Sequence, residues 1–439
     1  MSEALLSNIY NAFDPFRPLE PGDAFYVYCQ DVRGNDNIQR ELGRKIVRSN
    51  QPTYQLYTGH RGVGKSTELK RLKVDLESKG YRVVYFTADE DIDEDDAQYT
   101  DILLACTRHI LEDLKDTANA SPLTMWLKSR WNALKDLALT EVEFDKLQVD
   151  AQISQFAKLT ATLRQVPNTR KTIREQVDNH SIALLDALNE FIHDAKSKLG
   201  QTKVVVIADN LDRIVPSPRD DGRTNHDEIF IDRSGSLRKI DCHVIYTVPI
   251  SLVYSNRATQ LRDNYGDCQV LPMLMVRQRD GEINQHGLDR VKELIAKRIS
   301  KYAANKVLET EIFDQPSTLE QVCLASGGHM REVMQLMQTS LDWTDKLPIK
   351  PDAVRQAVTR ARNSYRNAVD NEDWEKLARV NRSKMLPNED DYRNLLFNRC
   401  LLEYRYIDEN GEQQRWHDVH PLITGIREFQ TALSHLPQS

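Results

Sequence analysis

Eight residues near the start of the chain constrain its fold more than any other segment. They read Gly-His-Arg-Gly-Val-Gly-Lys-Ser at positions 59–66 and match the pattern G-x-x-x-x-G-K-[ST] at every fixed position. The residues before them, 54–58, are typical of a β-strand, and those after them carry apolar side chains at helical spacing. A strand, a glycine-rich loop and a helix in this order begin a parallel α/β sheet. The segment therefore predicts an α/β fold built on such a sheet.

The same segment predicts a phosphate-binding loop. Its glycines allow the backbone N–H groups to point at a phosphate, and the N-terminal end of the following helix adds positive potential. Lys65 is expected to reach the β- and γ-phosphates of ATP, and the hydroxyl of Ser66 is expected to bind Mg²⁺. The predicted nucleotide-binding residues are Gly59, His60, Arg61, Gly62, Val63, Gly64, Lys65, Ser66 and Thr67.

A second segment supports the nucleotide site. Residues 204–208 form an unbroken apolar run that ends at Asp209, and such runs are typical of central strands buried on both faces. In enzymes with this loop, an aspartate at the end of such a strand holds Mg²⁺ beside the serine of the loop. Asp209 and Ser66 are therefore the predicted metal ligands.

The residue after Asp209 bears on the rate of hydrolysis. Asn210 stands there, and a carboxamide does not accept a proton from water. Asp212, three residues after Asp209, is the candidate carboxylate to replace it. We therefore expect firm ATP binding and slow hydrolysis, a profile that suits a switch better than a motor.

Composition places the chain among ordinary globular proteins. It has 439 residues, of which 40% are apolar and 28% charged, enough for two or three domains. No apolar run approaches the roughly 20 residues of a membrane span, and the first residues lack the features of a signal peptide. The six cysteines are scattered singly, so we expect a cytoplasmic protein with reduced thiols and no zinc site. A net charge of −7 argues against a protein that coats DNA.

Residues 1–275 are predicted to form the ATPase core, with an N-terminal lead-in and alternating strands and helices. Residues 120–175 are an expected insertion between two core strands, suited to partner contact or to extra packing. A helix is expected over 126–139, whereas 144–163 fits a strand and a helix equally, and one long helix is expected over 172–198. The other core strands are expected at 82–86, 242–248 and 269–274.

The C-terminal part is predicted to hold a helical lid (276–348) and a winged helix-turn-helix domain (349–439). The second prediction depends on a helix over 391–400 followed by a hairpin whose turn contains Asn-Gly at 410–411. The acidic residues at 388–391 stand where a DNA-reading helix would approach phosphate and would be repelled there. We therefore expect this domain to pack on the ATPase core or on a protein partner, and DNA binding is disfavoured.

Four motifs in this order resemble those of AAA+ and STAND ATPases: the loop at 59–66, Asp209 to Asp212, the polar strand end at Thr247, and Gly-Gly-His-Met-Arg at 327–331. The resemblance covers roughly residues 25–425. It is nearest to the branch shared by origin-recognition initiators and STAND signalling ATPases. It implies a P-loop sheet followed by a lid and a winged helix, with ATP and Mg²⁺ as cofactors.

The resemblance also implies roles for residues outside the loop. Thr247, or Ser251 as a second choice, would touch the γ-phosphate or the attacking water, and Arg331 would sense the γ-phosphate from the lid. With Asp209 and Asp212 they form the predicted catalytic set. Arg33 is a candidate for an adenine contact, although a plain surface turn fits it as well. The arginine finger stays open among Arg213, Arg238, Arg257 and Arg262.

Two hypotheses of function follow. The first is a STAND-like regulatory switch that controls a separate protein effector or sensor partner, as in bacterial signalling or anti-phage defence; self-association into a homo-oligomer is left open. The alternative is a DNA-binding AAA+ initiator or loader that uses the winged helix on duplex DNA. A helicase-like motor is disfavoured by Asn210.

Overall fold

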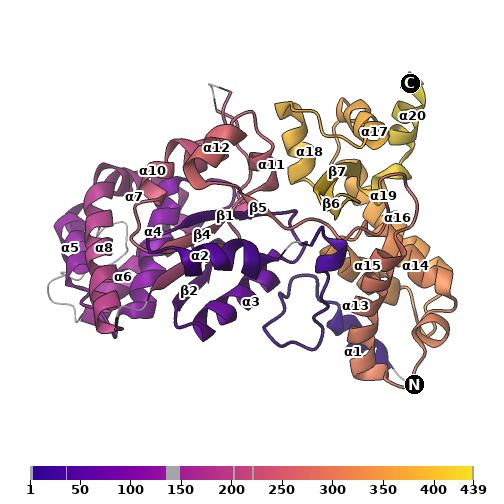
Figure 1. The fold of residues 1–439 in the computed structure, drawn as a ribbon, viewed down its shortest axis with the longest axis horizontal. Coiled ribbons are helices and arrows are strands. Elements are labelled where there is room, and N and C mark those ends of the chain that lie inside the picture. The colour runs from indigo at the N-terminus through magenta and orange to yellow at the C-terminus, as the bar shows by residue number, and fades with distance from the viewer. Residues whose placement is uncertain (1–2, 36, 135–148, 201–202, 220–221, 438–439) are drawn as a thin grey trace.

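A computed structural model describes residues 3–35, 37–134, 149–200, 203–219 and 222–437 (Figure 1). Its centre is a five-stranded sheet with the order β2-β3-β4-β1-β5, and every strand pair in it is parallel. The predicted α/β fold with a P-loop sheet is therefore confirmed. The strands are β1 (Tyr54–Thr58), β2 (Arg82–Thr87), β3 (Val204–Asp209), β4 (His243–Thr247) and β5 (Gln269–Val270).

The register of the strands brings the predicted site residues to one edge. Thr87 at the end of β2 pairs with Asp209 at the end of β3, and Tyr57 of β1 pairs with Thr247 of β4. Because the carboxyl ends of parallel strands share an edge, the turns that follow β1, β2 and β3 converge there.

Alternate residues of the central strands pack on opposite faces of the sheet. Val204 and Val206 face the cluster that contains α4 (Tyr99–Leu114), whereas Val205 and Ile207 face the cluster that contains α3 (Lys65–Ser78). All four valine and isoleucine side chains are fully buried. This explains why the β3 run is apolar without alternation. A π-helical turn (Gln39–Gly43) and α2 (Arg44–Arg48) lie beside α3.

The insertion extends the α4 face of the sheet, at the far end of the molecule from both termini (Figure 1). The stretch 144–163, whose sequence fits a strand and a helix equally, is helical where the structure describes it. The single long helix expected over 172–198 is instead two helices. Pro167 begins the first of them, and a break at His180 separates it from the second. Residues 135–148 lie outside the described residues. The insertion helices are α5 (Ser121–Leu134), α6 (Val149–Gln165), α7 (Pro167–Asn179) and α8 (Ser181–Lys198).

Short helices link the later strands to one another. They are α9 (Asn225–Asp227), α10 (Ser234–Leu237), α11 (Ile250–Val253) and α12 (Ala258–Tyr265). The last core strand, expected over 269–274, ends after two residues. Beyond β5 and Pro272, the N–H of Met273 donates to the carbonyl of Glu403 at 3.1 Å, so the chain here contacts a C-terminal strand instead of extending the sheet.

The helical segment, residues 285–367, follows the sheet. It contains α13 (Gln285–Ala303), α14 (Pro316–Ala325), α15 (Met330–Asp342) and α16 (Pro351–Asn367). The N-terminal helix α1 (Glu3–Ala12) packs on α13 and α15, and Ile9 and Phe13 are fully buried in the same cluster. The N-terminal lead-in is therefore packed partly on the helical segment.

The C-terminal segment, residues 373–435, contains helices and one antiparallel hairpin, β6 paired with β7. The hairpin was predicted from its Asn-Gly turn. The helix expected over 391–400 is shorter, because a 3-10 turn precedes the five-residue α18. The elements are α17 (Asp373–Ser383), α18 (Arg393–Phe397), β6 (Leu401–Ile407), β7 (Gln413–Val419), α19 (Pro421–Thr424) and α20 (Arg427–His435). In the described part of the chain, no helix has the length and apolar character needed to cross a membrane.

Candidate nucleotide-binding site

A cavity of about 550 Å³ opens at the carboxyl edge of the sheet. Its walls are the P-loop, the turns after β2 and β3, the N-terminal lead-in around residues 14–33, the middle of α13 and the N-terminal part of α15. The predicted phosphate-binding loop is therefore one wall of this cavity, and the helical segment contributes another.

The glycines of the loop have the geometry that the pattern requires. Gly59, Gly62 and Gly64 have φ of 146°, 88° and 112°, a region that L-residues rarely adopt. A Cβ atom on Gly59 would lie 2.5 Å from the carbonyl oxygen of Leu271, and one on Gly62 would lie 2.7 Å from Cβ of Arg331. Backbone conformation and close approach both exclude a side chain at these two positions.

Lys65, the first residue of α3, is fixed by three acceptors. Its Nζ donates to the carbonyls of Gly59 at 2.8 Å and His60 at 3.0 Å. It also forms an ion pair with Oδ2 of Asp212 at 2.9 Å, and both side chains are only 5% exposed. The structure thus brings together Lys65 and Asp212, two predicted site residues. Their distance in sequence gave no sign of this contact.

Asp209 lies beneath the loop and is fully buried. It accepts a hydrogen bond from Tyr85 Oη at 2.7 Å and another from the N–H of Asn210 at 2.7 Å. Burial raises the pKa of Asp209 and the nearby charge of Asp212 raises it further, while hydrogen bonds from Ser66 and Tyr85 act in the opposite direction. The hydrogen bond from Ser66 places the two predicted Mg²⁺ ligands beside each other.

This donor set fits Mg²⁺ in a nucleotide complex. The described residues contain no cluster of three or more His, Cys, Asp or Glu side chains able to hold a metal alone. Mg²⁺ with ATP needs fewer protein ligands, since phosphate oxygens and water complete its coordination. One hydroxyl from Ser66 and one carboxylate from Asp209 satisfy that requirement.

Asn210 lies at the wall of the cavity in a left-handed conformation, with φ of 65°. Its Nδ2 donates to Oδ1 of Asp89 at 2.7 Å. Arg213 donates to the other oxygen of the same carboxylate at 2.9 Å. Asp89 belongs to a 3-10 turn (Ala88–Glu90) directly after β2. The sequence reading missed it, although an acidic residue after a predicted parallel strand was the available signal.

Thr247 is fully buried and is not one of the residues that line the cavity. Its hydroxyl accepts from the N–H of Leu211 at 2.9 Å and lies 3.4 Å from the carbonyl of Ala208. Thr247 thus supports the turn that carries Asp209 to Asp212. Its role toward the γ-phosphate stays a prediction.

Arg331, in the first turn of α15, lines the cavity and touches the P-loop. Its N–H donates to the carbonyl of Gly62 at 3.1 Å, and Nε donates to the carbonyl of Pro15 at 3.2 Å. Burial lowers the pKa of Arg331 to about 10, and the like charges of Arg399 and Arg213 act in the same direction. An anion placed here would relieve that repulsion, so the position suits a sensor of phosphate charge.

Part of the cavity lining is less polar and comes from the N-terminal lead-in and the helical segment. The lead-in contributes Phe25 and Ile38, and the helical segment contributes Leu294 and Met334. Arg33, the candidate adenine contact, lines the cavity and donates to the carbonyl of Val63 at 2.9 Å. Apolar side chains beside a phosphate-binding loop provide a place for a base. Apart from Arg33, no local sequence pattern marked these residues as part of the site.

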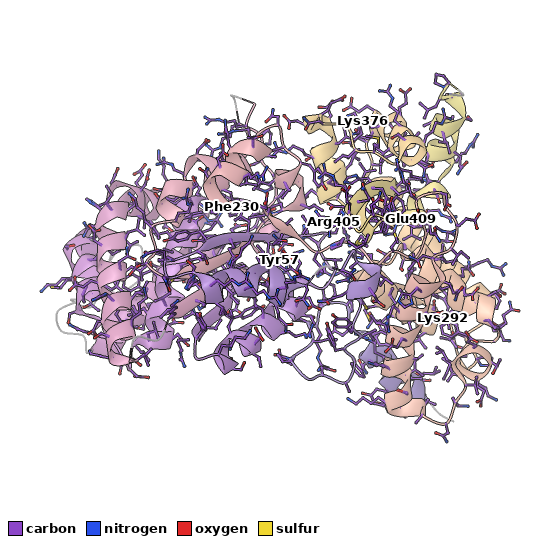
Figure 2. The ribbon with its side chains drawn as sticks, viewed as in Figure 1. Tyr57, Phe230, Lys292, Lys376, Arg405 and Glu409 are labelled. Atoms are coloured by element: carbon purple, nitrogen blue, oxygen red, sulfur yellow. The ribbon has the colours of Figure 1, made fainter. Side chains whose placement is uncertain are left out.

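The C-terminal segment is docked directly on the P-loop. The N–H of Glu403 in β6 donates to Nε2 of His60 at 3.0 Å, and the guanidinium of Arg61 lies 5.4 Å from the ring centre of Phe397 in α18. Burial lowers the pKa of His60 to about 3, so the imidazole is neutral and can accept this bond. In Figure 2, Arg405, which pairs with Glu403 at 2.7 Å, lies on the side of the C-terminal segment that faces the sheet.

Further polar contacts join α18 and its preceding turn to the core. Arg393 pairs with Asp227 at 3.4 Å, with both side chains largely buried, and Asn256 donates to Asp390 at 2.7 Å. The acidic residues expected to repel DNA therefore include one that binds the ATPase core.

No family model matches the chain, and no curated protein matches its sequence. Several solved archaeal structures are similar in fold. Cdc6p from Pyrobaculum aerophilum is 12% identical, with 97% of each chain covered and a TM-score of 0.40. The ORC2 protein of Aeropyrum pernix, in its ADPNP–ADP complexes, is 11% identical over 96% of each chain, with a TM-score of 0.42. The ORC1 protein of the same organism, in complex with DNA, is 12% identical over 94% of each chain, with a TM-score of 0.36. Likenesses this distant carry no argument about function, which depends on the contacts described above.

Proposed function

We propose that the protein is an ATP-operated conformational switch of the STAND/AAA+ type. It binds ATP with Mg²⁺ at the P-loop, hydrolyses it slowly, and couples the state of the nucleotide to the docking of its C-terminal segment. The observation that carries the proposal is the hydrogen bond between the N–H of Glu403 and Nε2 of His60. It joins the C-terminal segment to the loop that holds the phosphates, so a change in the loop reaches the segment directly.

The proposed site uses four residues for nucleotide. Lys65 leaves Asp212 to bind the β- and γ-phosphates, and Arg331 approaches the γ-phosphate from α15. Ser66 and Asp209 hold Mg²⁺, which neutralises charge on the phosphate oxygens when bound. Thr247 supports the turn that carries Asp209 to Asp212, and Asp212 orients Lys65. Arg331 donates to Gly62 through its own backbone, so it couples the loop to the helical segment.

We infer that the C-terminal segment is a winged helix that serves protein contacts. Its proposed reader helix, α18, is five residues long, and Leu395 and Leu396 are buried. The tip of the hairpin carries Asp408, Glu409 and Glu412, which are unfavourable beside DNA phosphates. Undocking would expose an apolar face suited to a protein effector or to a second copy of the chain. In this proposal, undocking of the C-terminal segment is the step that regulates a separate effector, as in bacterial signalling or anti-phage defence.

The test measures nucleotide binding and docking in one protein. Lys65→Ala should abolish binding of a fluorescent ATP analogue, whereas Lys73→Ala on the same helix should leave it unchanged. Amide hydrogen exchange over residues 393–419 should then differ between the ATP- and ADP-bound wild type and be insensitive to nucleotide in Lys65→Ala. Normal ATP binding by Lys65→Ala would end the nucleotide proposal. Equal exchange in every nucleotide state would end the switch.

A DNA-binding initiator or loader is the second candidate. In that function the winged helix would contact duplex DNA; one solved structure of similar fold is an archaeal ORC1 protein in complex with DNA, and that likeness is one of fold only. Steady-state ATP turnover with and without duplex DNA separates the two functions. Strong stimulation by DNA would replace the switch with the initiator; slow turnover indifferent to DNA is the result expected of the switch.

A further inference from the structure

Asn210 stands directly after Asp209, the predicted Mg²⁺ ligand, and carries no group that can accept a proton. Its side chain nevertheless makes a hydrogen bond inside the site. Its Nδ2 donates to Oδ1 of Asp89 at 2.7 Å, and both residues line the cavity. The carboxylate that position 210 lacks is therefore present one hydrogen bond away. It comes from the neighbouring strand β2 through the turn that follows it.

Two other carboxylates beside the P-loop are already committed. Asp209 is buried beneath the loop and bonded to Tyr85. Asp212 is paired with Lys65 in a contact that is almost fully closed to solvent. Asp89 differs from both, because its side chain is 29% exposed and reaches the cavity.

Asp89 is also oriented from two sides. Asn210 holds Oδ1, and Arg213 holds Oδ2 at 2.9 Å. A carboxylate has about four acceptor positions, so two remain for a water molecule. Two fixed donors also restrict the rotation of the carboxylate, as a catalytic base requires.

We propose that Asp89 is the catalytic carboxylate of ATP hydrolysis and that Asn210 is its positioning residue; this inference rests on the proposed ATPase function. The oxygen of a water molecule bonds to the γ-phosphorus as the bond between that phosphorus and the bridging oxygen of ADP breaks. The electron pair of the broken bond stays with ADP. Asp89 accepts the proton of the water and releases it to the phosphate product.

The first experiment compares Asp89→Asn with wild type in single-turnover hydrolysis and in ATP binding. General base catalysis is typically worth 100-fold or more, so kcat should fall by about that factor while the Kd for ATP stays within about two-fold. Asp95→Asn is the matched control, since Asp95 is exposed in the same acidic loop. It should leave both kcat and Kd unchanged.

The decisive experiment exchanges the two side chains. The double variant Asp89→Asn with Asn210→Asp keeps one carboxylate and one carboxamide in contact and reverses their places. It should hydrolyse ATP at least about ten-fold faster than Asp89→Asn alone, because each residue compensates for the other. A residue with only a structural role would not give rescue by moving the charge across a hydrogen bond.

Three results would overturn the inference. The first is a kcat unchanged in Asp89→Asn. The second is a double variant no faster than Asp89→Asn, with ATP binding intact in both. The third is a wild-type protein that binds ATP and does not hydrolyse it, which would leave the proposed nucleotide binding standing. A wild-type protein that does not bind ATP would remove the proposed function as well, so the two failures are distinguishable.

Discussion

At the scale of single residues, the P-loop lysine and its counter-ion form a nearly closed pair. The Lys65–Asp212 distance is 2.9 Å and both side chains are 5% exposed. A triphosphate has to draw Lys65 away from this carboxylate, so Asp212 competes with the nucleotide. Because the Lys65–Asp212 ion pair has to break before ATP binds, it weakens the apparent affinity for ATP.

We therefore expect Asp212→Asn to bind ATP more tightly, by roughly ten-fold, or about 1.4 kcal/mol. The measurement is a titration with a fluorescent ATP analogue, and Asp263→Asn, an exposed change on α12, is the control. Weaker binding by Asp212→Asn would mean that Asp212 holds Lys65 in its productive position instead of competing for it.

At the scale of elements, the local motifs were predictable and their partners were not. The strand, loop and helix around 59–66 and the hairpin at β6–β7 depend on neighbouring residues, which a single sequence displays. Asp89 contacts Asn210 across 121 positions of the chain. Likewise, His60 meets Glu403 across 343 positions. Periodicity carries no information about such contacts, so the cavity walls and the individual contacts that dock the C-terminal segment could not be predicted, although packing of that segment on the ATPase core was one of the two expected outcomes.

The insertion illustrates the same limit and holds the acidic loop after β2 in place. Arg174 in α7 donates to Asp101 at 2.6 Å and to Asp96 at 3.0 Å. The side chains of Arg174 and Asp101 are 9% and 3% exposed. The buried ion pair thus ties the insertion to α4, and the contact with Asp96 reaches the loop between Asp89 and α4.

Arg174→Met should lower the free energy of unfolding by about 3–5 kcal/mol, because it leaves the Asp101 carboxylate buried and unpaired. Adding Asp101→Asn should recover part of the loss by removing that charge. Lys171→Met, at a side chain that is 87% exposed, should change the free energy by less than about 0.5 kcal/mol. Urea unfolding of the four proteins measures these differences, and equal values for Arg174→Met and Lys171→Met would contradict the account.

At the scale of the whole molecule, buried neutral histidines are concentrated where the ATPase core, the helical segment and the C-terminal segment meet. Burial is the largest cause of a lowered pKa at each of them. The pKa falls to about 3 at His60 and to about 4 at His226, His243 and His417, and it falls well below its usual value at His329 and His420. His60 in the P-loop, His329 before α15, and His417 and His420 in the C-terminal segment concentrate these groups where the three parts meet.

This arrangement predicts a loss of stability on acidification. Below about pH 6.5 the unfolded chain binds a proton at each of these histidines, whereas the folded chain does not until its lower pKa is reached. The contribution of these histidines to the free energy of unfolding is therefore complete above pH 6.5. This stability declines by about 1.4 kcal/mol per pH unit for each histidine as the pH falls toward 4.

The midpoint of urea unfolding at pH 7.5, 6.5 and 5.5 measures the dependence of stability on pH. His417→Gln should reduce that slope by about one proton, whereas His193→Gln, an exposed change on α8, should not alter it. A stability independent of pH between 7.5 and 5.5 would mean that these histidines do not stay neutral in the folded protein.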